Sequence, residues 1–194
     1  MFRRDVLLSV GGYDTDTFAE DADLTLKILT AGWQIKYEER AIAYTEAPEH
    51  LLDLLKQRYR WTRGILQALG KRKSFLVSPK IGIGVWLSLN TMFFEAVLWP
   101  TVNVVGNLVF AIGALVMGIP EYVLYWWMML TILDVAAALY AVAMEEEDLA
   151  LVPFAVLYRL FFIVTVDVAK LFASLEELFK VRMTWGKLER AGRL

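Results

Sequence analysis

One stretch of the sequence strongly limits what this chain can fold into. Between Lys80 and Arg159 there is no lysine or arginine. The acids within it are Glu95, Glu121, Asp134 and a run at residues 145–148. Apolar segments of about 20 residues are long enough to cross the hydrocarbon layer of a bilayer. Since 58% of all residues are hydrophobic, an ordinary soluble domain is excluded and an integral membrane protein is predicted.

Three apolar segments are predicted to form membrane helices. Residues 121–144 and 151–174 are each long enough for one crossing, whereas residues 81–118 are interrupted by an acid and a proline. The first segment is either an interfacial helix followed by one crossing, or two short crossings that meet near Pro100. If the N-terminal part and the basic tail, residues 180–194, are both cytoplasmic, the number of crossings is even, which favours four over three.

The polar first part of the chain carries a glycine turn and an acidic cluster. Gly11 and Gly12 follow a short apolar run, and glycines let the backbone approach a neighbour or a ligand closely. Glu20, Asp21 and Asp23 precede apolar residues at helical spacing, so they are expected in the first turn of a helix. Capping explains one or two of these acids. Three carboxylates together also form a candidate general-base or metal-proximal cluster.

Two short runs after this helix are predicted to be strands. Residues 33–37 alternate apolar and polar side chains, and residues 41–44 form a second run. A helix followed by strands indicates the end of an α/β unit. His50, the only histidine, stands at a predicted helix start, where a polar or capping role is favoured over metal binding.

A basic amphipathic helix is predicted to join the polar part to the apolar part. From residue 51 to residue 69, apolar residues recur at three- and four-residue steps along one face. Roughly the opposite face carries Gln57, Arg60, Trp61 and Gly64. The apolar face is expected to bury in a membrane surface or a protein core, while the other face presents an amide, a guanidinium and an indole. The basic residues nearby suit an anionic headgroup layer or a phosphate ligand.

These features together resemble membrane-integrated glycosyltransferases of family 2, the group that contains synthases of cellulose, chitin, hyaluronan and poly-N-acetylglucosamine. Three motifs carry the resemblance: Gly11-Gly12-Tyr13, the pair Glu20-Asp21, and Gln57-x-x-Arg60-Trp61 followed by apolar helices. The resemblance implies that the chain is part of an enzyme that transfers sugar from a nucleotide sugar to a growing polysaccharide, with inversion at the anomeric carbon.

Roles for individual residues also follow from this resemblance. It implies that Asp21 is the general base that deprotonates the acceptor hydroxyl, with Glu20 beside it as a further catalytic residue. It places Arg60 near the nucleotide diphosphate and Trp61 near the acceptor sugar. Further substrate-binding positions are Gln57, Gly11 and Gly12. The residue types suit these roles, because a guanidinium neutralises a departing diphosphate, an indole offers a face to a sugar ring, and a carboxylate takes a proton.

The resemblance covers only the back portion of the family pattern. The family's front half, with its Asp-x-Asp metal motif, has no counterpart here, and Asp21-Ala22-Asp23 has that form only beside the expected base. We therefore expect Mg²⁺ or Mn²⁺ in the full-length enzyme to be held by ligands outside this chain, and no metal ligand is assigned within it. We also expect the chain to be a C-terminal fragment or split product that is inactive alone.

The predicted fold is an α-rich membrane protein in four parts. These are the end of an α/β glycosyltransferase domain at residues 1–50, an interfacial helix at 51–80, a transmembrane bundle of three to four helices at 81–179, and a basic cytoplasmic tail at 180–194. The expected location is the inner (plasma) membrane, crossed several times, with residues 1–80 in the cytoplasm. The expected partners are a nucleotide sugar, a polysaccharide acceptor, the lipid bilayer and a missing N-terminal half, and not nucleic acid.

Two other classes of function stay open at this point. In a membrane scaffold or subunit, Glu20 and Asp21 only cap a helix, and the basic helix only binds anionic lipid. In a small transporter, Asp134, Asp167 and Lys170 act as polar groups within the membrane. For Asp134, contact with another helix is favoured over exposure to lipid.

Overall fold

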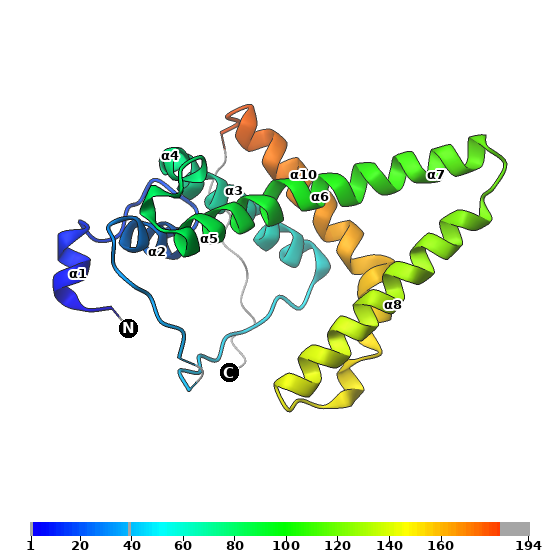
Figure 1. The fold of residues 1–194 in the computed structure, drawn as a ribbon, viewed down its shortest axis with the longest axis horizontal. Coiled ribbons are helices and arrows are strands. Elements are labelled where there is room, and N and C mark those ends of the chain that lie inside the picture. The colour runs from blue at the N-terminus through cyan, green and yellow to red at the C-terminus, as the bar shows by residue number, and fades with distance from the viewer. Residues whose placement is uncertain (1, 39, 183–194) are drawn as a thin grey trace. The chain divides into compact units, whose positions relative to one another are not determined.

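The computed structural model describes residues 2–38 and 40–182, whose regular secondary structure is helical, without a strand among them (Figure 1). Contacts divide the chain into two compact units. The first comprises Met1–Leu98 together with Ala169–Leu194, and the second comprises Trp99–Val168. The α-rich part of the predicted fold is therefore confirmed.

The first unit begins with two helices joined by the glycine turn. α1 spans Arg4–Ser9 and α2 spans Glu20–Thr30. Gly11 and Gly12 adopt φ values of 80° and 71°, and Gly32, which follows α2, adopts 88°. Side chains with a Cβ rarely tolerate such left-handed values, so the glycines permit the turn and the end of α2.

α3, Leu51–Lys71, matches the predicted amphipathic helix closely. The sequence placed Gly64 on the open face, but the structure buries it where α3 meets the chain just before α2. A Cβ on Gly64 would lie 2.6 Å from the Cβ and the backbone nitrogen of Ala19, and 2.8 Å from the carbonyl carbon of Phe18. Because real Cβ atoms do not approach other atoms so closely, only glycine fits at this crossing.

The core of the first unit lies between α2, α3 and α5. It buries Leu26, Ala68, Leu69 and Leu89. α4, Lys73–Leu76, leads into α5, Ile83–Phe93, and the side chains of Trp86 and Asn90 both donate to the carbonyl of Leu76, at 2.9 and 3.2 Å. The start of the first apolar helix is thus fixed to the helices that carry the polar motifs.

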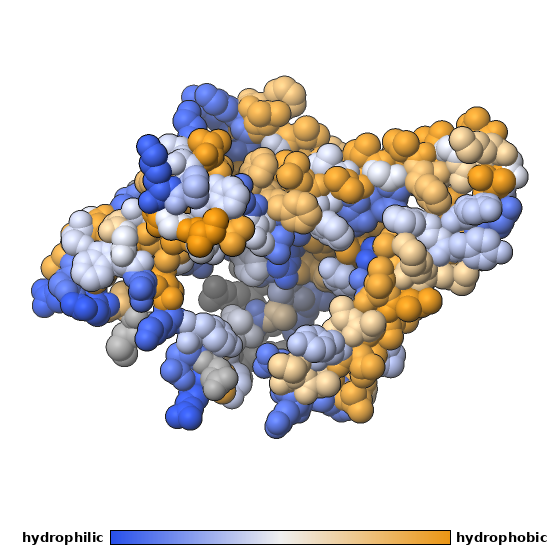
Figure 2. Space-filling model, viewed as in Figure 1, coloured by the Kyte–Doolittle hydropathy of each residue, from blue (hydrophilic) through white to orange (hydrophobic). Residues whose placement is uncertain are grey.

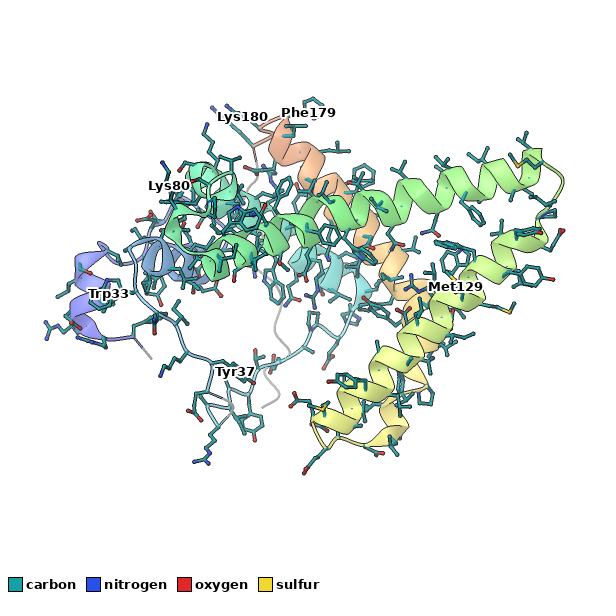
Figure 3. All side chains as sticks on the ribbon, in the orientation of Figure 1. Trp33, Tyr37, Lys80, Met129, Phe179 and Lys180 are labelled. Atoms are coloured by element: carbon teal, nitrogen blue, oxygen red, sulfur yellow. The ribbon has the colours of Figure 1, made fainter. Side chains whose placement is uncertain are left out.

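The connection between α2 and α3 has no regular secondary structure, so the prediction of strands at residues 33–37 and 41–44 is wrong for the described chain. Tyr37 and Tyr44 are 91% and 88% exposed, and Figure 3 shows Tyr37 on this connection. A strand needs hydrogen bonds to a neighbouring strand, and the described residues offer no such neighbour. The α/β part of the predicted fold is accordingly not confirmed.

The apolar half of the chain continues from α5 as a series of helices. The elements after α5 are α6 (Trp99–Thr101), α7 (Asn107–Val116), α8 (Glu121–Met144), α9 (Phe154–Leu157) and α10 (Ile163–Leu178). Turns of π-helix at Phe94–Leu98, Val102–Gly106 and Tyr158–Phe162 join several of them without a break. Figure 2 shows apolar side chains gathered along α7 and α8.

Among the described residues, three helices are long and apolar enough to cross a membrane: Ile83–Val116, Glu121–Met144 and Leu149–Leu178. The first is one helix of 34 residues that runs through Pro100, so the alternative of two short crossings meeting there is wrong. The preference for four crossings rests on the charges of the two ends of the chain, and the number of crossings stays a prediction. The π-helical turns on either side of Pro100 accommodate the proline by rearranging the backbone hydrogen bonds.

Small residues bring α10 close to the first apolar helix within the first unit. Ala96 and Ala173 are 5% and 0% exposed, and small side chains let membrane helices approach closely. Pro100 has no N–H to donate to the carbonyl of Ala96, one turn before it. The hydroxyl of Ser174 donates to that carbonyl at 3.1 Å, which offsets part of the loss.

The second unit holds polar side chains that pair with one another. Arg159, which is buried, donates to both carboxylate oxygens of Asp134, one of them at 2.8 Å. Asn103 donates to the buried carboxylate of Asp167 at 2.6 Å. Such pairing is how charges are tolerated in an apolar setting. The pair with Arg159 agrees with the prediction that Asp134 contacts another helix.

The predicted basic tail, residues 180–194, is described only as far as residue 182. Phe179 and Lys180 follow directly after α10 (Figure 3). The remaining residues of the tail lie outside the described chain.

We expect Gly64→Ala to lower the free energy of unfolding by about 1–3 kcal/mol, because the added methyl must displace Ala19 or the backbone of Phe18. Gly70→Ala is the matched control, since it lies on the same helix with nothing within 4 Å of an added Cβ. It should be neutral or stabilising by up to about 1 kcal/mol, because alanine favours helix. Thermal unfolding of both variants in detergent, followed by circular dichroism, makes the comparison. Equal effects of the two changes would contradict the close crossing.

Candidate active site

Two exposed carboxylates stand at the first turn of α2. Glu20 and Asp21 open the helix, and both are exposed. Oδ1 of Asp21 accepts a hydrogen bond from the N–H of Ala22 at 2.7 Å. The residue at the N-cap is Ala19, which has no side chain that caps the helix. The helix dipole favours acids here, but their exposure also leaves them available to a ligand.

Asp23, the third acid of the predicted cluster, is buried where α2 packs against the end of α3. It is 1% exposed, and its Oδ1 accepts from Nη1 of Arg72 at 2.5 Å. Nη2 of Arg72 donates to the backbone carbonyl of Asp23 at 3.1 Å, and Nζ of Lys71 donates to the other carboxylate oxygen at 2.9 Å. A buried carboxylate needs this compensation. Asp23 therefore joins α2 to the end of α3, separate in role from Glu20 and Asp21.

Asp14, Asp16 and Asp23 bring carboxylate oxygens within 4.8 Å of one another, close enough to share a metal ion. The ammonium group of Lys71 already lies among them and donates to all three. Burial alone would lower the pKa of Lys71, but the hydrogen bonds to Asp16, Asp23 and Asp14 outweigh it and raise that pKa above its ordinary value. The cluster is thus balanced by the protein's own cation, and its donor set does not fit an added metal.

Gln57, Arg60 and Trp61 lie on the face of α3 that meets the start of α2. At about 100° per residue, all three side chains leave the helix within about 60° of the direction of Gly64. Gly64 in turn contacts Ala19, the residue before Glu20. The two polar motifs of the sequence, far apart along the chain, therefore stand on segments that pack against each other.

The indole of Trp61 is partly open to solvent. Trp61 is 43% exposed, whereas Gln57 and Arg60 are half-buried. The guanidinium of Arg58 lies 4.7 Å from the centre of the Trp61 ring, a cation–π contact that orients the side chain. An oriented, exposed aromatic face suits the apolar side of a sugar ring.

The glycine turn lies beside the middle of α2. Nζ of Lys27 donates to the carbonyl of Gly12 at 3.1 Å and to Asp14 at 2.7 Å. The hydrogen bond from Lys27, and then the one from Lys71, lower the pKa of the Asp14 carboxyl below its ordinary value. Lys27 follows Asp21 by six residues, a rise of about 9 Å along the helix. A substrate contact of Gly11 and Gly12 stays a prediction.

Sequence reasoning missed a network that holds the opposite side of α3. Arg63, 3% exposed, donates to Glu177 at 2.9 Å, to the hydroxyl of Tyr59 at 3.1 Å and to the carbonyl of Val181 at 2.5 Å. The Tyr59 hydroxyl donates to Glu176. Burial, and then this hydrogen bond, raise the pKa of Tyr59 above its ordinary value. More than one hundred residues separate Tyr59 and Arg63 from Glu176 and Glu177, so no local spacing in the sequence signals these contacts.

The sequence of this chain is similar to those of known proteins. The model of glycosyl transferase family group 2 matches residues 1–164. A probable glycosyltransferase of Bacillus subtilis (strain 168) is 25% identical over 203 residues, which cover 97% of this chain and 47% of that protein. A cellulose synthase of Novacetimonas hansenii is 36% identical over 83 residues, or 43% of this chain and 5% of the relative.

A third relative is a poly-beta-1,6-N-acetyl-D-glucosamine synthase of Staphylococcus aureus (strain COL), 39% identical over 64 residues, or 33% of this chain and 16% of the relative. The chain spans less than half the length of each of these three relatives. No solved structure matches it significantly. Because the family model covers most of the sequence, the chain belongs to glycosyl transferase family group 2.

Proposed function

We propose that this chain forms the acceptor side of the sugar-transfer site in a membrane-integrated, inverting glycosyltransferase that extends a polysaccharide. The observation that carries the proposal is the packing of the Glu20-Asp21 turn, through Ala19, against the face of α3 that bears Gln57, Arg60 and Trp61. Family membership and relatives that include cellulose and poly-N-acetylglucosamine synthases support it.

In the proposed reaction, Asp21 accepts the proton of an acceptor hydroxyl while that oxygen attacks the anomeric carbon of the donor sugar. The bond from this carbon to the nucleoside diphosphate breaks, and the diphosphate leaves with the electron pair. Attack from the side opposite the leaving group inverts the anomeric configuration. Glu20 lies beside Asp21, where its negative charge favours transfer of the proton to the pair.

The residues of α3 act on the two ends of this reaction. The fixed charge of Arg60 offsets the charge that develops on the departing diphosphate. Trp61 supports the acceptor ring through its exposed face, and Gln57 hydrogen-bonds to sugar hydroxyls. A divalent cation, Mg²⁺ or Mn²⁺, would supply further positive charge at the diphosphate, held by residues of the full-length enzyme outside those assigned here.

The proposed setting is the cytoplasmic face of the inner membrane. Residues 1–80 carry most of the 20 lysine and arginine residues of the chain, as expected for a cytoplasmic part. We propose further that residues 33–37 and 41–44 become strands of an α/β glycosyltransferase domain once a sheet edge is present. Their alternation and the exposure of Trp33, Ile35 and Tyr37 support this, because such side chains favour a half-buried sheet.

We expect Asp21→Asn to lower the rate of sugar transfer by about 10²–10⁴-fold, the range for loss of a general base. Transfer of radiolabelled sugar from UDP-glucose or UDP-N-acetylglucosamine is measured in membranes that contain the longest reading frame encoding this chain. Asp5→Asn, another exposed acid near the start of a helix, is the control and should keep full activity. Full activity of the Asp21 variant would leave only a capping role. The chain by itself is assayed in parallel, where we expect no transfer.

Trp61→Ala should raise the KM for the polysaccharide acceptor by about tenfold, because the loss of an aromatic face removes about 1 kcal/mol or more of stacking. Trp61→Phe keeps a ring and should retain most of the affinity. Trp99→Ala is the matched control, since Trp99 and Trp61 are both 43% exposed and Trp99 lies on the first apolar helix. A similar KM for the Trp61→Ala and Trp99→Ala variants would argue against a sugar-stacking role of Trp61.

Hydrogen exchange tests the proposed strands. Backbone amides at residues 34–37 should exchange rapidly in the chain alone, and at least tenfold more slowly in the longest reading frame, because strand pairing protects them. Amides in the buried part of α3, residues 62–69, serve as the reference and should exchange slowly in both. Unchanged rapid exchange at residues 34–37 would refute the α/β proposal.

A further inference from the structure

The end of α10 is joined to α3 by a buried charge pair that includes a second donor. Oε2 of Glu177 accepts from Nε of Arg63 at 2.9 Å and also from Nε2 of Gln67 at 3.1 Å. Arg63 is 3% exposed, and its charge is compensated by this carboxylate and by that of Glu176, 3.5 Å away. Glu177 is thereby held in one place and presents the same oxygen to Gln67.

Gln67 passes this constraint to the chain before α2. Its Oε1 accepts from the backbone N–H of Phe18 at 3.1 Å, while its NH₂ group donates to Glu177. An amide has one acceptor end and one donor end, so these two partners are both satisfied in only one orientation of the side chain. Phe18 precedes Ala19 and Glu20, so the hydrogen bond acts directly on the backbone that leads into the acidic turn.

We propose that Glu177 is a positioning residue for the Glu20-Asp21 turn and acts through Gln67. The contact at Gly64 limits how closely the turn can approach α3, but van der Waals contact alone does not fix its position along the helix. The hydrogen bond from the N–H of Phe18 to Gln67 fixes the position of the turn along α3. A displacement of about 1 Å is enough to impair a positioned catalytic group. The catalytic meaning of this inference rests on the proposed function, whereas the structural coupling does not.

Glu176 provides an internal comparison because it is the neighbouring acid on the same helix. It accepts from Tyr59 and lies 3.5 Å from Nη1 of Arg63, on the other branch of the network. The hydrogen bond to Gln67 comes from Glu177. Neutralising either acid changes the net charge equally, but only the change at Glu177 alters the partner of residue 67.

The experiment compares three variants of the full chain in detergent. Gln67→Glu places a second carboxylate against Glu177, and their repulsion should displace the side chain. Gln67→Glu with Glu177→Gln exchanges the two groups, so one carboxylate and one amide again face each other. Gln67→Glu with Glu176→Gln has the same composition and net charge, but it leaves the repulsion in place.

Hydrogen exchange of the Phe18 amide is the readout, measured by NMR on protein labelled with ¹⁵N-phenylalanine. Gln67→Glu should accelerate this exchange about five- to tenfold, as expected for loss of a hydrogen bond. The exchanged pair with Glu177→Gln should return the rate to within about twofold of the original, and the pair with Glu176→Gln should not. No effect of Gln67→Glu, rescue by both pairs, or rescue by neither would overturn the proposal.

Activity of the longest reading frame separates this inference from the proposed function. Gln67→Glu should lower kcat about tenfold and change the KM for the nucleotide sugar less than twofold, because it displaces the base and not the donor. The exchanged pair with Glu177→Gln should restore kcat. If Asp21→Asn leaves transfer intact while the exchange pattern at Phe18 holds, the proposed function fails and the coupling stands. If kcat is unaffected while Asp21→Asn abolishes transfer, the positioning role fails alone.

Discussion

The candidate site depends on the close crossing of α3 with the start of α2, where Gly64 leaves no room for a side chain. Polar contacts to α3 and its C-terminal end lie on both sides of Ala19 in the sequence. Phe18 bonds to Gln67, Ala19 meets Gly64, and Asp23 bonds to Arg72. The crossing therefore sets the separation of the two helices, and the polar contacts set their alignment. Without both, the Glu20-Asp21 turn would not be held in one position against the face of α3 that carries Gln57, Arg60 and Trp61.

Buried arginines join helices at three places in the described chain. Arg72 faces Asp23, Arg63 faces Glu177, and Arg159 faces Asp134. Moving such charges out of water is costly, so these pairs add less to net stability than their geometry suggests. Their larger effect is on alignment, because a displaced helix would leave a charge buried and uncompensated. Apolar packing between helices tolerates small displacements much better.

Local periodicity was enough to predict α3 and the apolar helices, because helical spacing reflects only neighbours along the chain. It could not separate Asp23 from Asp21, since their difference comes from Arg72, which lies 49 residues away. The burial of Gly64 was missed for the same reason, although its face, shared with Gln57, Arg60 and Trp61, was predicted correctly. Residues 33–44 have the pattern of strands, but a strand also needs a partner that the described chain does not offer. The roles of Asp21, Glu20, Gln57, Arg60 and Trp61 come from the family resemblance and stay predictions.

The length of the first apolar helix has a consequence for how much of it can lie within a bilayer. Ile83–Val116 has 34 residues, or about 51 Å, whereas bilayer hydrocarbon is about 30 Å thick. Its opening turns bury Leu89 against Leu26, Ala68 and Leu69, whereas Ile83 and Leu87 on the same turns are 64% and 51% exposed. The remaining length is enough for one crossing. The helix therefore has length beyond a single crossing, which allows its first turns to pack against α2 and α3.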